Sequence, residues 1–589
     1  MLTKTTSCYD GQRVRSLASR LVGALMLLAA TITATPGRAE PAAPGTSALE
    51  PPRNFDLVIA HGHIVDGTGS PWYSGDVGIR GGRIAAIGHL ERESRARTVD
   101  AHGLVVAPGF IDMLGQSELS ILIEPRLPSK IYQGITSEIT GEGNSVAPLT
   151  DAMVRADQAG YAHYGVTADW RTLREYLARI EKQGIGINFA TYVGATTVRR
   201  MVLGDDDRQP SADQLAQMRS LLEESMRAGA VGVSSALEYA PAPYAKTDEL
   251  IALATVASRY GGIYATHMRS EGDAIMAALD EALRIGREAD IPVEIWHLKV
   301  AGKHNWGQMP AVVAKIDAAR ASGIDVSANT YAYTAWSNDL SAFIPPWAHD
   351  GGNVKLIARL KDRAQRERIR QDMLHASSEW DNEWDEMPGP EAIIIGVVHK
   401  PALKPLLGKT LAQVAALWKK DPMDALFDLL IADDGLTEVA VFGMSESDVA
   451  LALQQPWVSV DNDSEGTSPE GVLGQDHPHP RAYATFPRIL RKYVREEHKL
   501  TLEDAIRKFA ALPAQRMRLI DRGVLKEGMW ADVVIFDPAT IQDRATFENP
   551  NQLSEGMEYV LVNGVPVIER GHMTGALPGR VLRGAGYRP

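Results

Sequence analysis

The sequence predicts an α/β protein: a (β/α)8 barrel of the TIM type, with a small β-sandwich domain formed from both chain ends. Eight short apolar runs alternate with helical patterns in the middle of the chain, which is typical of parallel strands buried on both faces. Polar residues stand where several of these runs end. Short alternating β patterns with Gly turns lie near both termini, and neither set alone is large enough for a core.

The first 39 residues have the pattern of an export signal. Three arginines precede the apolar run Leu21–Ala30, and Gly37-Arg38-Ala39 fits a cleavage site. The apolar run is shorter than the roughly 20 residues that a membrane span needs. We therefore expect a cleaved signal peptide over 1–39, no stable membrane anchor, and a periplasmic or secreted bacterial protein.

The composition is that of an ordinary globular protein. The 589 residues are 45% hydrophobic and 23% charged, with a net charge of −13. No basic run suggests a nucleic-acid partner. The single cysteine, Cys8, lies inside the predicted signal, so metal ligands in the mature protein must be His, Asp or Glu.

A Pro/Ala-rich linker is expected over 40–54, followed by the N-terminal part of the sandwich over 55–106. Its C-terminal part is expected over 521–589. The predicted strands of this domain are Asp56–Ala60, His63–Val65, Gly75–Ile79, Arg83–Ile87, Ala531–Phe536, Tyr559–Val562 and Val565–Glu569.

The barrel is expected over 107–520. Helical patterns such as Ala212–Ala228 and Ala274–Ala289 separate its strands. An excess of chain at about 335–455 reads as an insertion that could cover the site. The predicted strands are Leu104–Asp112, Ile135–Thr140, Ile187–Val193, Ala230–Ser235, Ile263–His267, Val293–His297, Asp325–Tyr331 and Trp457–Asp463.

Catalytic groups of such a barrel project from the C-terminal ends of its strands. His267 and His297 end two successive predicted strands, and Asp463 ends the last one. Zn²⁺ held by histidines beside a carboxylate base is a common apparatus for amide hydrolysis. Asp461 competes with Asp463, but it would lie two residues deeper on the same face of the strand.

Six segments of the chain have a distinctive sequence: APGFID from Ala107, ATHMRSEG from Ala265, HLKVAGKHNWG from His297, HPHPRAYATFPR from His477, DRGVLKEGMWADVVIFDP from Asp521 and VLVNGVPV from Val560. In these segments, and over nearly all of residues 55–589, the sequence resembles the N-acyl-D-amino-acid deacylases (D-aminoacylases) of the amidohydrolase superfamily. The resemblance implies a zinc-binding barrel with a β-sandwich, His267 and His297 as ligands, and Asp463 as the proton-transferring base.

Two familiar parts of the superfamily's metal site are missing. Leu114 and Gln116 stand where a His-x-His pair usually follows GFID, and no Gly-Asn-Cys-Gly turn is present. Glu142 lies in the equivalent loop, and a carboxylate oxygen is an acceptable zinc ligand. The expectation is one zinc ion per chain, held by His267, His297 and Glu142. The alternative for Glu142 is a carboxylate that binds nearby backbone amides.

The resemblance also implies residues that contact the substrate. Lys299 and Arg481 match positions that bind the substrate carboxylate, for which a guanidinium suits a bidentate contact. Tyr239 matches a tyrosine that could hydrogen-bond the scissile carbonyl. Two further possibilities stay open: His477 and His479 as alternative metal ligands, and a supporting ion pair between Arg269 and Glu271.

The predicted function is zinc-dependent hydrolysis of the linear amide in N-acyl-amino acids. The family resemblance implies that the amino acid has the D configuration. The alternatives are a cyclic-amide hydrolase of the hydantoinase or dihydroorotase kind and a non-catalytic exported binding protein. The partner is a small-molecule N-acyl-amino acid, and the sequence gives no oligomeric state.

Overall fold

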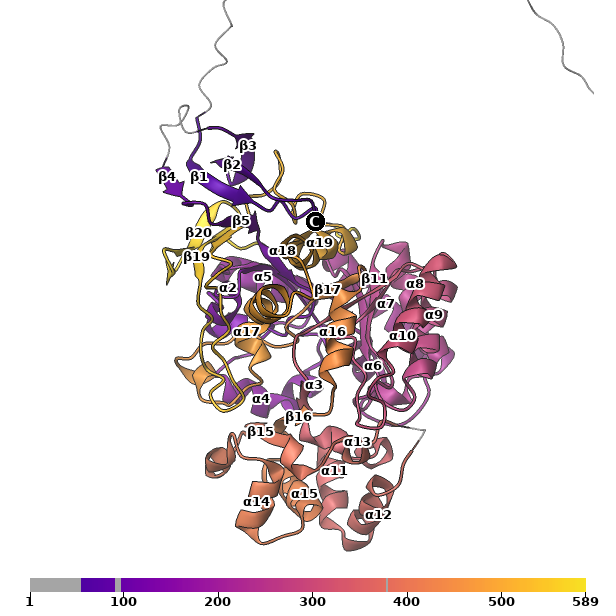
Figure 1. Ribbon diagram of the computed structural model, residues 1–589. Coiled ribbons are helices and arrows are strands. Elements are labelled where there is room, and N and C mark those ends of the chain that lie inside the picture. Colours follow the sequence, from indigo (N-terminus) through magenta and orange to yellow (C-terminus); the bar gives the residue numbers. More distant parts are fainter. Residues whose placement is uncertain (1–53, 91–96, 378–379) are drawn as a thin grey trace, which may run out of the picture. The chain divides into compact units, whose positions relative to one another are not determined.

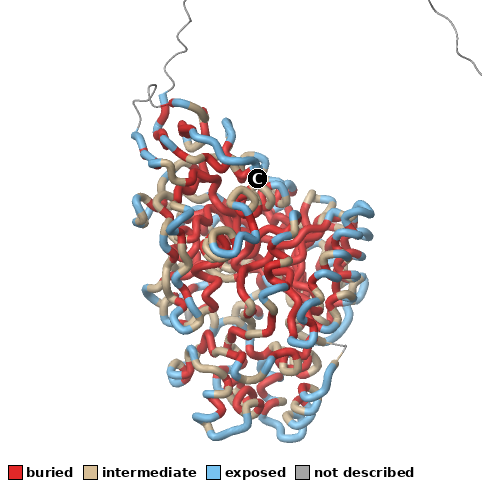
Figure 2. The backbone as a smooth tube through the Cα atoms, in the orientation of Figure 1, coloured by how far each residue is buried: buried red, intermediate tan, exposed pale blue. Residues whose placement is uncertain are grey.

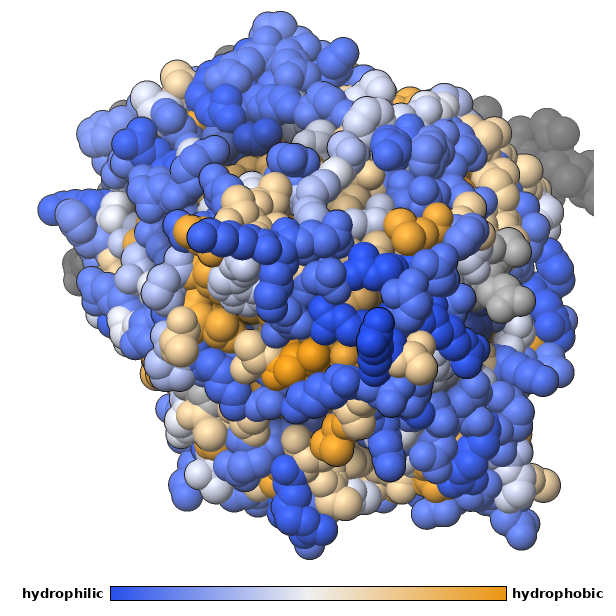
Figure 3. Space-filling view, turned by 90° about the horizontal axis from the view of Figure 1, so that it is seen from below, coloured by the Kyte–Doolittle hydropathy of each residue, from blue (hydrophilic) through white to orange (hydrophobic). Residues whose placement is uncertain are grey.

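The computed structural model describes residues 54–90, 97–377 and 380–589 (Figure 1). The predicted signal peptide and all of the predicted linker except Asn54 lie outside the described residues. Among the residues described, no helix is long and apolar enough to cross a membrane. On the face shown in Figure 3, hydrophilic side chains dominate and hydrophobic ones are interspersed among them.

The predicted eight-stranded barrel is confirmed. Its parallel strands pair in chain order in two sheets, which meet where Tyr192 interrupts the third predicted strand. The residues of these strands are almost all buried (Figure 2), as expected for strands covered on both faces. The strands are β6 (Phe110–Asp112), β7 (Ile135–Thr140), β8 (Asn188–Thr191) with β9 (Val193–Gly194), β10 (Gly232–Ala236), β11 (Ile263–His267), β12 (Val293–Ile295), β13 (Val326–Thr330) and β17 (Val458–Val460).

The barrel closes between its first and last strands. The Met113 amide donates to the Val460 carbonyl at 3.4 Å, and the Asp463 amide donates to the Leu114 carbonyl at 3.0 Å. The Gln116 amide donates to the Ser464 carbonyl at 3.1 Å. The segment after β6, where the sequence lacks two histidines, therefore lies directly beside Asp463.

Helices connect the barrel strands, and three more follow the last strand. Two of the longer ones start with a capping box: the Ser211 side chain accepts from the Gln214 amide before α7, and Thr172 does the same with Glu175 before α5. The helices are α1 (Ser120–Ile123), α2 (Pro128–Ile131), α3 (Asp151–Ala156), α4 (Gln158–His163), α5 (Leu173–Gln183), α6 (Ala195–Leu203), α7 (Ala212–Ala228), α8 (Thr247–Arg259), α9 (Ile275–Ala289), α10 (Met309–Ala321), α16 (Glu446–Gln454), α17 (Arg481–Arg488), α18 (Leu502–Ile506) and α19 (Leu512–Arg516).

The first predicted strand, Leu104–Asp112, is wrong as a single element. It divides at Gly109 into β5 (Val105–Pro108), which pairs with β18 (Val533–Phe536), and β6, which pairs with β7. A Cβ at Gly109 would lie 2.2 Å from Thr136 Oγ1, so only glycine fits where the chain passes from one sheet to the other. The predicted boundary at 106/107 falls inside β5.

Strands from both chain ends form one nine-stranded sheet. Two predicted strands, Asp56–Ala60 and His63–Val65, are one strand, β1, with a register shift between Ile59 and Gly62. His61 in that bulge has a φ of 57°. The other strands are β2 (Tyr73–Arg80), β3 (Arg83–Gly88), β4 (Arg97–Asp100), β19 (Met557–Val562), β20 (Val565–Glu569) and β21 (His572–Met573), with β1 spanning Leu57–Ile64.

The segment inserted between β13 and β17 contains a three-stranded antiparallel sheet, in the order β14 (Ala335–Asp339), β16 (Glu438–Phe442), β15 (Ile393–Val397). The end of the predicted insertion differs, because α16 packs against α10 and β17 as a barrel helix does. The helices of the insertion are α11 (Asn353–Lys361), α12 (Arg363–Met373), α13 (Glu383–Glu386), α14 (Leu411–Trp418) and α15 (Pro422–Ala432).

A buried ionic cluster lies beside the barrel closure. Lys130 on α2 has no solvent exposure; its Nζ lies 2.7 Å from Asp112 Oδ2 and 3.2 Å from Glu138 Oε2. The same ammonium donates to Asn462 Oδ1 and to the Ser464 carbonyl, both at 2.8 Å. One buried side chain thus links β6, β7 and the segment after β17.

Replacing Lys130 by methionine should destabilise the protein strongly. The substitution leaves the carboxylates of Asp112 and Glu138 buried without their cation, which typically costs about 3–5 kcal/mol. The measurement is the denaturant midpoint of unfolding. Arg284→Ala, which removes only exposed ion pairs to Asp248 and Glu288, is the control and should barely move the midpoint. Equal midpoints for the two variants would contradict a structural role for the cluster.

Candidate active site

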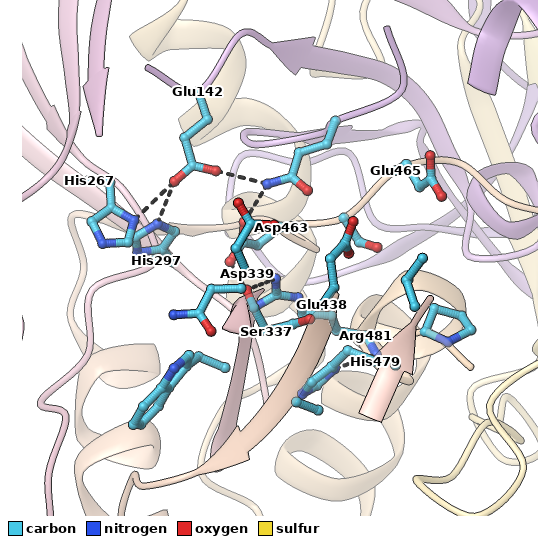
Figure 4. A pocket seen from close by; sticks show the side chains of 18 of the residues that line it. Glu142, His267, His297, Ser337, Asp339, Glu438, Asp463, Glu465, His479 and Arg481 are labelled. Carbon is cyan, nitrogen blue, oxygen red and sulfur yellow. Dashed lines mark hydrogen bonds and ion pairs between the residues drawn. The ribbon is translucent and has the colours of Figure 1, made fainter. Parts of the chain in front are cut away.

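The predicted site residues lie around one cavity of ≈ 340 Å³. The barrel strands supply its base and the insertion supplies part of its wall (Figure 4). A cavity of this size is within the range of small-molecule sites. All seven residues predicted for the site line it: Glu142, Tyr239, His267, His297, Lys299, Asp463 and Arg481.

Glu142 lies in a tight turn directly after β7. Its neighbours Gly141 and Gly143 both have positive φ, 98° and 60°, a conformation that glycine adopts without strain. The turn directs the Glu142 carboxylate at two imidazoles. Its Oε1 atom lies 3.1 Å from His267 Nδ1 and 3.1 Å from His297 Nε2.

The two histidines come from neighbouring strands. His267 ends β11 and His297 follows β12, and their ring centroids are 4.6 Å apart. The Tyr239 ring packs edge-on against His267 at 4.8 Å. The structure thus brings together the three residues that were predicted to hold a metal.

The donor atoms of Glu142, His267 and His297 lie within 4.8 Å of one another, so this set fits a metal ion. A second set, Glu238, His267 and Glu271, meets the same criterion and shares one histidine. Imidazole nitrogens and carboxylate oxygens are ordinary zinc ligands. Although burial raises the pKa of Glu142, hydrogen bonds from His267 and His297 outweigh it and hold that pKa well below its usual range.

Asp463 connects to this group through Gln116. The Gln116 Nε2 atom donates to Glu142 Oε2 at 2.8 Å and to Asp463 Oδ1 at 3.1 Å. Arg481 Nη1 lies 2.7 Å from Asp463 Oδ2. Burial raises the pKa of Asp463 and Arg481 partly offsets this, so the carboxylate takes up a proton more readily than an exposed aspartate.

Two of the residues brought together have unusual backbone. His297 and Asp463 have φ values of 37° and 45°, which non-glycine residues adopt at a cost of about 1–3 kcal/mol. The Asn329 side chain accepts a hydrogen bond from the His297 backbone amide at 2.7 Å, which stabilises the unusual conformation of His297. Such strain clusters at functional sites.

Lys299 and Arg481 line the cavity with their charges already partnered. Lys299 Nζ lies 2.7 Å from His297 Nδ1 and 2.5 Å from Glu271 Oε2. Arg481 Nη2 donates to the Ser337 carbonyl at 3.3 Å, and its guanidinium lies over the Tyr331 ring. The buried Arg481 Nε has no hydrogen-bond partner among the described residues.

Other residues considered from the sequence have different partners. His477 Nε2 lies 2.6 Å from the Phe547 carbonyl, and both ring nitrogens of His479 contact backbone atoms, so neither is arranged as a ligand. The ion pair between Arg269 and Glu271, which the sequence left open, is not formed. Arg269 binds Glu281 at 2.8 Å, while Glu271 binds Lys299.

Asp461 is fully buried, and neither of its carboxylate oxygens has a hydrogen-bond partner among the described residues. Burial and the charge of Asp463 raise its pKa well above the usual range. β17 ends at Val460, so Asp461 lies past the strand end, not deeper in the strand as predicted. It does not line the cavity, which favours Asp463 as the base.

Three contacts around the histidines were not predicted from the sequence. Glu238 Oε2 lies 2.6 Å from His267 Nε2, Glu271 Oε1 lies 3.0 Å from His297 Nδ1, and Gln116 bridges Glu142 and Asp463. Only Glu271 has a local signal, since it is four residues after His267. In the sequence Gln116 was noted only as standing in the place of a missing histidine, not as a bridge.

Comparison with known proteins identifies the family. The chain is 37% identical over 530 residues to an N-acyl-D-glutamate deacylase of Alcaligenes xylosoxydans xylosoxydans, covering 90% of this chain and 96% of that one. It is 37% identical over 534 residues to a D-aminoacylase of the same organism, covering 90% and 97%. The chain belongs to the N-acyl-D-amino-acid deacylase family of the amidohydrolase superfamily.

The model of the amidohydrolase family matches residues 470–568. An N-acyl-D-glutamate deacylase structure from Bordetella bronchiseptica, complexed with zinc and a phosphonate inhibitor, superposes with a TM-score of 0.75 at 34% identity, covering 90% of this chain and all of that one. A D-aminoacylase structure from a study of its binuclear metal centre gives 0.74 at 34% identity with the same coverage.

Family membership gives the class of reaction. The chain is a hydrolase that acts on carbon–nitrogen bonds other than peptide bonds, as predicted. This sets aside the alternative of a non-catalytic binding protein. The relatives' structures contain metal centres, in agreement with the donor sets found here.

Proposed function

We propose that this protein hydrolyses the linear amide of N-acyl-D-amino acids with one zinc ion, releasing a carboxylic acid and a free D-amino acid. The proposal rests on one observation: Glu142, His267 and His297 converge on a common point in the cavity, and Asp463 is one side chain away through Gln116. His₂Glu with one open position is a recognised hydrolytic zinc set.

Bound at this set, zinc would supply the Lewis acidity that polarises an amide carbonyl and acidifies water. The protein supplies the rest. Asp463 accepts the proton of the attacking water, because its buried carboxylate has a raised pKa. It then protonates the departing nitrogen, which leaves as a free amino group.

The substrate is held at its carboxylate and at its scissile carbonyl. Arg481, which lines the cavity, binds the substrate carboxylate, and Lys299 lies near enough to the histidines to hold the same group beside the reacting carbon. Burial raises the pKa of Tyr239 well above its usual range, so its hydroxyl stays protonated and can donate to the scissile carbonyl.

We also propose that the chain is exported, with residues 1–39 as a cleaved signal peptide. Support for this comes from the sequence pattern of charged residues, apolar run and small residues. Mass spectrometry of the protein purified from its host's periplasm or medium would show a mature N-terminus near residue 40.

The experiment is a hydrolysis screen with paired N-acetyl-D- and N-acetyl-L-amino acids on zinc-loaded mature protein. We expect kcat/KM to be at least about tenfold higher for the D member of a pair. A single site cannot hold the acyl group, the carboxylate and the amide of both enantiomers in the same productive positions. Hydantoin and dihydroorotate are included for the cyclic-amide alternative. Faster hydrolysis of L members, or of the cyclic amides, would contradict the proposal.

A further inference from the structure

The walls of the active-site cavity carry many more acidic than basic side chains. Eleven carboxylate side chains line it, against two side chains of fixed positive charge, Lys299 and Arg481. Both cations are already paired, Lys299 with Glu271 and Arg481 with Asp463. The remaining acidic side chains face a partly enclosed space, where a bound cation would be attracted strongly to those that ionise.

Two of these carboxylates are placed directly opposite each other. Asp339 of β14 and Glu438 of β16 are partners in the antiparallel register, a position at which like charges destabilise a sheet. Neither side chain has a hydrogen bond or ion pair with another described residue. Half-buried Glu438 has a pKa raised well above its usual range by burial and by the charges of Asp339 and Glu465.

A third carboxylate gives an independent indication. The Glu386 side chain lines the same cavity, is only 4% exposed, and has no hydrogen bond or ion pair among the described residues. Burying an unpaired carboxylate is costly, and a positively charged ligand in the cavity would offset that cost.

The pair of Asp339 and Glu438 lies close to the residue assigned to the substrate carboxylate. Arg481 donates to the carbonyl of Ser337, which is two residues before Asp339 on β14. Arg481, Asp339 and Glu438 lie together in the cavity (Figure 4). A substrate whose carboxylate binds Arg481 would therefore extend its side chain along this acidic wall.

We propose that the preferred substrates are N-acyl-D-amino acids with a cationic side chain, an ammonium or guanidinium group of the lysine or arginine type. The side-chain cation binds between Asp339 and Glu438 and relieves their mutual repulsion. The inference rests on the proposed deacylase function and specifies its substrate class. It also predicts discrimination against the acidic side chain of N-acyl-D-glutamate.

The primary test needs only the unaltered zinc-loaded enzyme. Its kcat/KM is compared for N-acetyl-D-lysine, N-acetyl-D-arginine, N-acetyl-D-glutamate and N-acetyl-D-norleucine, which has the carbon chain of lysine without the amine. We expect the two basic substrates to exceed norleucine by about tenfold or more, and glutamate to be the poorest. Added salt should reduce the preference for the basic substrates.

Variants then locate the preference. Glu438→Gln and Asp339→Asn each remove one acidic group that a bound cation would hold ionised, and each should lower the ratio of kcat/KM for D-lysine over D-norleucine by about fivefold to tenfold. The matched control is Glu391→Gln, which removes an exposed charge just before β15 and should leave the ratio unchanged. Inhibition by free D-lysine, compared with D-norleucine, measures the same preference without turnover.

The possible outcomes separate this inference from the proposed function. Equal or faster hydrolysis of norleucine or glutamate substrates would overturn the basic preference and leave the deacylase function standing. A preference for lysine that survives both variants would overturn the assignment to Asp339 and Glu438. Absence of hydrolysis of every substrate would overturn both proposals together.

Discussion

Asp463→Asn is expected to lower kcat for N-acyl-D-amino acids by about 10²–10⁴-fold, the usual contribution of a general acid–base group. Asparagine keeps the size of the side chain and can still contact Gln116 and Arg481, but it cannot accept the water proton. Zinc content should stay near that of the unaltered protein. Steady-state kinetics and metal analysis of the same preparation measure both.

Asp461→Asn is the matched control for this variant. Asp461 lies two residues away and is fully buried, and its raised pKa favours the neutral acid, which asparagine resembles. We expect little change in kcat. The assignment of the base would be wrong if Asp461→Asn lost as much activity as Asp463→Asn, or if Asp463→Asn kept most of its activity.

Glu142→Ala is expected to release zinc and to abolish most activity. It removes the carboxylate whose Oε1 atom lies 3.1 Å from both His267 Nδ1 and His297 Nε2, and loss of a direct ligand should weaken zinc binding by about 100-fold or more. Zinc affinity is measured by competition with a chelator. Activity at saturating zinc then shows whether the residue also affects the reaction.

Glu238→Ala distinguishes the two donor sets. Glu238 belongs to the set with His267 and Glu271, whereas Glu142 belongs to the set with His267 and His297. If the proposed set holds the metal, Glu238→Ala weakens zinc binding much less than Glu142→Ala, and His297→Ala matches Glu142→Ala. The reverse order would place the metal at the second set.

The barrel could be predicted from the sequence because its strands leave a strong pattern. Ile135–Thr140 and Ile263–His267 were predicted with the bounds that the structure has, since short apolar runs between helical patterns have few other interpretations. His267, His297 and Asp463 could be predicted to lie close together because parallel strands of a barrel end on the same face. Glu142 was predicted as a metal ligand only because its loop is equivalent to a turn that carries a ligand in the family.

What could not be predicted depends on close contacts and on backbone conformation. Gly109 ends one strand because Thr136 leaves no room for a side chain, a contact between distant parts of the chain. Nothing in the sequence around Lys130 indicates that its side chain is buried between Asp112 and Glu138. The positive φ of His297 gave no signal, because neither glycine nor asparagine stands there.

The acidic cavity wall was missed for the same reason. Asp339 and Glu438 are 99 positions apart in the sequence and lie opposite each other only through the register of β14 and β16. Net charge is averaged over the whole chain, so a value of −13 does not show where acids gather. The insertion was expected to cover the site, but the sequence did not show which of its acidic side chains face the cavity.

Zinc titration of metal-free mature protein tests the central proposal most directly, with hydrolysis of paired N-acetyl-D- and N-acetyl-L-amino acids as the readout. Activity toward the D substrate should rise from near zero to a plateau at about one equivalent of zinc per chain, with the L substrate far slower throughout. Activity that is independent of zinc, or no hydrolysis of the D substrate at any zinc concentration, would contradict a zinc-dependent D-amino-acid deacylase.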